Sequence, residues 1–149
     1  MAKRARVLSA IIAAVAAPVF AAPAAMADST EITPMHHWGS CSNSGNTNDP
    51  GARCTSLSNG TLYVRKSADP SVTVQYYKSG GSSIYARLGF EQNGQNTWDS
   101  YKTMTYASEV VNRHFSRTWG PNSVGCTPVI GKLHVQNGTT YPTPTLGMC

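Results

Sequence analysis

The sequence predicts an all-β fold: a disulfide-stapled antiparallel β-sandwich of about six or seven short strands with an extended N-terminal arm. Short runs of alternating apolar and polar residues recur along the chain, turn-forming residues separate them, and helix-forming periodicity is nearly absent. Charged residues make up only 13% of the chain and there are 13 glycines. This composition is typical of exported β-proteins with many turns.

The first 27 residues have the three regions of a secretory signal peptide. Basic residues precede an apolar run over 7–19, and Ala25-Met26-Ala27 supplies a small-residue cleavage site. The run is too short to cross a bilayer comfortably, so we expect cleavage and no membrane span. The mature protein would begin near Asp28 and be extracellular.

Removal of this leader also removes positive charge. The whole chain has 12 Lys and Arg, 7 Asp and Glu, and a formal net charge of +5. Three of the basic residues are in the leader, so nine basic and seven acidic side chains remain and the net charge falls to +2. Nucleic-acid binding needs several clustered phosphate contacts, and we therefore expect no nucleic-acid partner.

The mature chain divides into an arm over 28–40 and a sandwich domain over 41–149, which contains all the cysteines. An even number of cysteines in an exported protein indicates disulfides, and the sequence alone permits three pairings. We favour Cys41–Cys54 and Cys126–Cys149, because each closes a local loop. The cysteine spacings lack the short pairs of zinc ligands, so we expect no metal and no cofactor.

The strands follow from local patterns, each bounded by turn residues. The most regular pattern is over 84–91, where Ile84, Ala86 and Leu88 alternate with outward-facing residues. A hairpin turn at 93–96 sends the next strand back, with Trp98 available for burial. A short helical turn is possible over 107–111, and two prolines make the last strand an edge strand. The predicted strands are 61–66, 71–78, 84–91, 97–105, 114–119, 129–136 and 139–143.

Sequence signatures of common hydrolases and phosphate-binding loops are absent. His36-His37 lacks a third ligand with fixed geometry, and His114 and His134 have no nucleophile motif beside them. Glu91 and Asp99 flank one hairpin and are the only paired carboxylates that suggest acid–base chemistry, but such residues are normally solvated. We therefore expect no enzyme activity and no catalytic residues.

Aromatic residues offer one binding hypothesis. They form either a platform that stacks on sugars or on a protein, or ordinary core and cross-strand packing, which explains most of them. The residues concerned are Tyr76, Tyr77, Tyr85, Trp98 and Tyr101.

The N-terminal arm offers a second binding hypothesis. It carries apolar and imidazole side chains that a monomer rarely leaves exposed together. The arm either folds back over the sandwich or inserts into a groove on another protein, and Pro34 argues against long strand pairing but not against insertion. The expected partner-binding residues are Ile32, Met35, His36, His37 and Trp38.

Several segments resemble small secreted proteins of streptomycetes and related actinobacteria, and among them the adaptor subunits of umbrella toxin particles. These segments are CTSLSNGTL at 54–62, YKSGGS at 77–82, ARLGF at 86–90, and Thr143-Pro144 ahead of Cys149. The resemblance implies a non-enzymatic adaptor whose arm, Ile32 to Trp38, docks into a lectin-like subunit of trypsin fold. Its globular body would hold a large ring-forming polypeptide that carries the toxin.

We therefore expect a secreted binding or adaptor protein that links other secreted proteins in an extracellular complex. Two alternatives remain open. A protease inhibitor would present the disulfide-bounded segment 42–53, with Arg53 as its specificity residue. A carbohydrate-binding module or glycosidase would use the tyrosines together with Glu91 or Asp99.

Overall fold

The computed structural model describes residues 40–69, 71–108, 113–120, 124–136 and 138–147. Over these residues the chain forms β-strands and turns, with no helical element. The strands are β1 (Ala52–Leu57), β2 (Gly60–Lys66), β3 (Val72–Lys78), β4 (Ile84–Gln92), β5 (Gln95–Trp98), β6 (Lys102–Met104), β7 (His114–Trp119), β8 (Ile130–Val135) and β9 (Thr140–Pro142).

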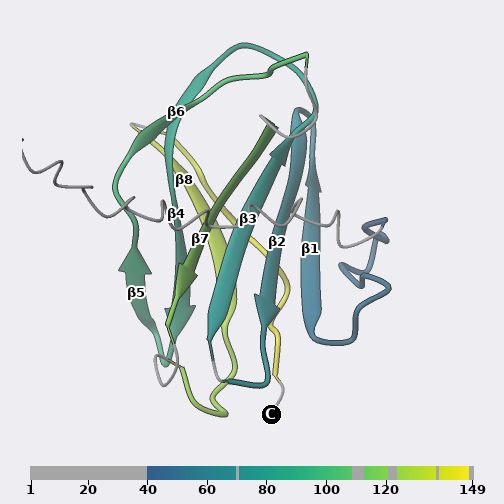
Figure 1. The fold of residues 1–149 in the computed structure, drawn as a ribbon, viewed down its shortest axis with the longest axis vertical. Helices are drawn as coiled ribbons and strands as arrows, with labels where there is room; N and C mark the ends of the chain where they lie inside the picture. Colours follow the sequence, from purple (N-terminus) through teal and green to yellow (C-terminus); the bar gives the residue numbers. More distant parts are fainter. Residues whose placement is uncertain (1–39, 70, 109–112, 121–123, 137, 148–149) are drawn as a thin grey trace, which may run out of the picture. The chain divides into compact units, whose positions relative to one another are not determined.

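The strands form two antiparallel sheets, which Figure 1 shows as two layers. The four-stranded sheet has the order β1-β2-β3-β7. The five-stranded sheet has the order β5-β4-β8-β9, and β6 pairs with the same edge of β4 as β5 does. The predicted all-β sandwich is therefore confirmed.

The inward-facing side chains of both sheets form one hydrophobic core. Alternation in β2 and β3 places cross-strand pairs such as Leu62–Tyr76 and Val64–Val74 on the inner face. Phe90 of β4 meets Trp119 of β7 edge-on, with ring centroids 5.0 Å apart. The buried cluster comprises Leu62, Val64, Val72, Val74, Tyr76, Ala86, Leu88, Phe90, Met104, Val124, Val129, Leu133 and Leu146.

Most of the predicted strands are present, and β9 is an edge strand as its prolines predicted. The hairpin turn after β4 has the positive φ angles expected there, 52° at Asn93 and 76° at Gly94. Two predictions were wrong. Strand β1 was missed, because it falls within and after the segment assigned to a polar loop, and the strand predicted over 97–105 is divided into β5 and β6.

The disulfide Cys41–Cys54 is present, with a Cα–Cα distance of 5.7 Å. Cys126 is also disulfide-bonded, whereas Cys149 lies outside the described residues. The predicted signal peptide, the arm residues up to Gly39 and most of the possible helical turn over 107–111 lie outside them as well. In the part of the chain that is described, no helix is long and apolar enough to cross a membrane.

Candidate binding surface

The outer face of the five-stranded sheet carries a group of aromatic and basic side chains that we call the aromatic–arginine cluster. Its members come from β4, from β5 and the segment after it, and from β8. They are Tyr85, Arg87, Trp98, Tyr101 and His134.

Strand alternation places the first members. Ala86 and Leu88 of β4 are fully buried in the core, so Tyr85 and Arg87 point to the opposite face. The next outward position is Gly89, which pairs directly with Trp98 of β5. A Cβ atom at residue 89 would overlap the indole ring, so the absence of a side chain there lets the ring of Trp98 lie over Gly89.

A β-bulge places Tyr101. β5 ends with Trp98 opposite Gly89, and β6 begins with Lys102 opposite Ala86. The chain thus uses Asp99, Ser100 and Tyr101 where β4 uses two residues. One extra residue reverses the alternation, so that Tyr101, rather than Ser100, joins Trp98 on the outer face.

The guanidinium of Arg87 lies between two aromatic rings. Its Cζ atom is 4.6 Å from the ring centroid of Trp98 and 4.7 Å from that of Tyr101, within range for cation–π attraction. Tyr85 stacks against Tyr101 with a centroid distance of 5.5 Å, and 46% of Tyr85 is exposed. The rings thus orient a cation and leave an aromatic side chain exposed beside it.

His134 completes the cluster from β8. Its ring centroid is 5.7 Å from that of Trp98 and 6.0 Å from that of Tyr101. Its Nδ1 is 2.8 Å from Oγ1 of Thr140 on β9, a hydrogen bond that fixes the ring orientation. His134 is a half-buried strand residue, as the sequence predicted.

The two carboxylates that flank the hairpin each bind cations and do not form an acid–base pair. Lys132 donates to Glu91 and also to Asn96. Asp99 lies 2.9 Å from Nζ of Lys102 and 3.9 Å from Nε of Arg117. Burial raises the pKa of Asp99, but hydrogen bonds from Lys102 and Ser100 and the charges of Lys102 and Arg117 outweigh burial and lower it.

The structure separates the five predicted platform residues. Tyr85, Trp98 and Tyr101 lie together, but Tyr76 is in the core at 2% exposure. Tyr77 packs against His114 of β7, on the four-stranded sheet, with ring centroids 4.8 Å apart. Trp98, which the sequence offered for burial, lies half-buried on the outer face because its partner Gly89 faces outward.

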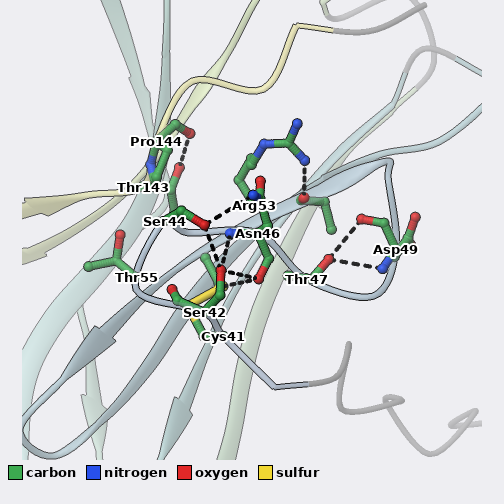
Figure 2. Close-up of a disulfide and its surroundings, with 12 residues drawn as sticks. Cys41, Ser42, Ser44, Asn46, Thr47, Asp49, Arg53, Thr55, Thr143 and Pro144 are labelled. Atoms are coloured by element: carbon green, nitrogen blue, oxygen red, sulfur yellow. Dashed lines mark hydrogen bonds between the residues drawn. A yellow bond between two sulfur atoms is a disulfide. The ribbon is translucent and has the colours of Figure 1, made fainter.

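The disulfide-bounded segment is a folded polar loop (Figure 2). The hydroxyl of Ser42 accepts a hydrogen bond from the backbone N–H of Asn46, and Thr47 and Asp49 form a second turn. Arg53 lies in β1 opposite Val64, and its Nη1 donates to the carbonyls of Pro50 and Ala52. This geometry does not display Arg53 on a projecting loop as a protease inhibitor would require.

The remaining predicted site lies outside the described residues: the arm side chains Ile32, Met35, His36, His37 and Trp38. Among the residues that are described, no three His, Cys, Asp or Glu side chains come together to hold a metal ion.

Sequence reasoning missed Arg87 and His134 as members of the cluster. The outward register of Arg87 beside Tyr85 was visible in the alternation of β4, but nothing in the sequence pattern indicates the bulge that brings Tyr101 to it. No protein-family model matches the chain, and neither a curated protein nor a solved structure matches it.

Proposed function

We propose that this chain is a secreted, non-enzymatic adaptor that binds one extracellular protein through the aromatic–arginine cluster and a second through its N-terminal arm. The single observation that carries the proposal is the position of Arg87 between Trp98 and Tyr101 on the outer face of the sheet. Trp, Tyr and Arg are the residue types that dominate the binding energy of protein interfaces.

The surroundings of the cluster support binding rather than catalysis. Glu91 and Asp99 are both engaged by lysines, and a carboxylate held in this way is a poor general base. Tyr85 is exposed on a sheet face, where a partner can cover it. In the assembly that the toxin-adaptor resemblance implies, this face would hold the ring-forming polypeptide and the arm would enter the trypsin-fold subunit.

The test is capture of partners from the native culture supernatant by the tagged mature protein, with identification by mass spectrometry. Tyr85→Ala and Trp98→Ala should each weaken capture of one partner by about 30-fold or more, which corresponds to a hot-spot loss of about 2 kcal/mol. Tyr106→Ala is the matched control, since Tyr106 is also exposed and also lies beneath an arginine, Arg113. Equal capture by all three variants would refute the cluster as the binding surface.

A carbohydrate-binding function is the second candidate. It is favoured by the stacked pair Tyr85 and Tyr101 on an open sheet face, because aromatic rings on such faces stack on sugar rings. A glycan array distinguishes the two functions. If the protein binds a neutral polysaccharide and Tyr85→Ala abolishes this binding, the carbohydrate function is established. If no glycan on the array is bound, the carbohydrate function is refuted.

A further inference from the structure

Arg87 differs from every other arginine that the structure describes. Arg65 pairs with Asp49 at 2.9 Å, and Arg117 lies 3.9 Å from Asp99. Arg53 and Arg113 both donate to backbone carbonyls. Arg87 contacts aromatic rings and, within the described parts of the chain, has no hydrogen bond and no ion pair.

The arrangement leaves an unused donor edge. Nε is the one nitrogen of the Arg87 guanidinium that is buried without a partner. The two terminal nitrogens, which have no hydrogen bond among the described residues either, are therefore not fully buried. The rings of Trp98 and Tyr101 hold the guanidinium, which limits the conformational entropy lost when a ligand binds its edge.

Charge around this edge favours an anion from outside the chain. The acidic residues that the structure describes along this sheet, Glu91 and Asp99, are already bound to Lys132 and Lys102. Carboxylate is the anion whose planar pair of oxygens matches the guanidinium fork.

We propose that Arg87 binds the carboxylate of an Asp or Glu side chain in an acidic segment of the protein partner, while an apolar neighbour in that segment packs on Tyr85. This inference rests on the proposed function and specifies the chemistry of the partner. A peptide is favoured because it supplies a carboxylate and an apolar side chain within a few ångströms of each other, matching Arg87 beside the exposed ring of Tyr85.

The probe is an immobilised library of octapeptides whose two central positions carry all pairs of amino acids. The mature protein should bind peptides that pair Asp or Glu with an apolar residue about 10- to 100-fold more tightly than their Asn or Gln counterparts, as expected for a charge-assisted hydrogen bond. Binding should weaken as salt concentration rises. Arg87→Gln should abolish this preference, and Arg87→Lys, which keeps the charge but loses the planar fork, should reduce it.

The matched control is Arg65→Gln, which removes a surface arginine of the four-stranded sheet and should leave the preference unchanged. Near-ultraviolet circular dichroism of each variant checks that the cluster is still folded. No enrichment of acidic peptides, or enrichment that survives Arg87→Gln in a folded protein, would overturn the proposal. Arg87-dependent binding of polygalacturonate without peptide binding would overturn it too, by placing the carboxylate on a sugar.

The proposed function is tested separately by partner capture. If Tyr85→Ala and Trp98→Ala lose the partner and Arg87→Gln keeps it, the surface binds protein without a carboxylate, and only this inference fails. If none of the three variants loses the partner, the proposed function fails with it.

Discussion

At the scale of single residues, Lys78 is the group whose environment has the clearest energetic consequence. It lies on β3, is 0% exposed, and its Nζ has no hydrogen-bond partner among the described residues. A buried polar group without a partner costs about 1–3 kcal/mol. Lys66 is the informative contrast, because it is similarly buried but its Nζ donates to the carbonyl of Thr127 at 3.1 Å.

Lys78→Met should therefore raise the free energy of unfolding at pH 7 by about 1–3 kcal/mol, whereas Lys66→Met should not, because it leaves a carbonyl unpaired. Burial lowers the pKa of Lys78 below 10.5. Between the folded pKa and 10.5 the unfolded chain binds more protons than the folded one, so stability rises with pH there. Urea unfolding from pH 7 to pH 10 measures both effects, and an unchanged pH slope in Lys78→Met would contradict this account.

The cluster illustrates what residue patterns reveal and what they conceal. Alternation in β4 determines that Arg87 faces away from Leu88 and the core, and this much is visible in the sequence. The stacking of Arg87 on Trp98 depends on strand register, and its contact with Tyr101 depends on the bulge. Register and bulges arise from long-range pairing, which no local pattern contains.

At the scale of elements, the loop closed by Cys41–Cys54 is held by a covalent bond and by a polar network. The sequence separation is 13, for which the chain-entropy model gives about 3 kcal/mol. The loop also contacts the C-terminal segment. Gly45 has a φ of 77°, and a Cβ there would overlap Pro144. The backbone of the disulfide loop and the C-terminal segment therefore approach each other closely at this point (Figure 2).

Replacement of both Cys41 and Cys54 by Ser should lower the free energy of unfolding by about 3 kcal/mol without changing the strand content. Urea unfolding and far-ultraviolet circular dichroism provide the measurements, without reductant so that the disulfide of Cys126 is kept. Ser42→Ala is the control for the network alone and should cost about 1 kcal/mol. If Ser42→Ala costs as much as the double replacement, the network rather than the disulfide holds the loop.

Strands were predicted correctly where the local sequence alternates between apolar and polar residues. They were predicted wrongly where strand formation or strand ends depend on pairing with a distant segment. β4 alternates over its whole length and was predicted almost to its ends. β1, with the sequence ARCTSL, alternates between buried and half-buried side chains only from Ala52 to Thr55. It is a strand because it pairs along its length with β2, with Cys54 opposite Tyr63. The pattern over 97–105 predicts one continuous strand, because nothing local marks Trp98 as the end of β5.

At the scale of the whole molecule, the adaptor proposal requires two independent binding surfaces on one stable body. The first residue of the buried core cluster is Leu62 and the last is Leu146. The first cysteine that forms a disulfide is Cys41. Removal of residues 28–39 therefore deletes no member of that cluster and no described disulfide.

Deletion of residues 28–39 should thus change Tm by less than about 5 °C, a shift that corresponds to about 1–2 kcal/mol in a domain of this size. The deletion should abolish capture of one partner and leave the partner of the aromatic–arginine cluster bound. Tyr85→Ala should do the reverse, and only the intact mature protein should join both partners in one complex on size-exclusion chromatography. A large fall in Tm would show that the arm belongs to the fold. Loss of both partners on deletion would mean that the arm and the cluster form a single surface, because independent surfaces separate under single changes.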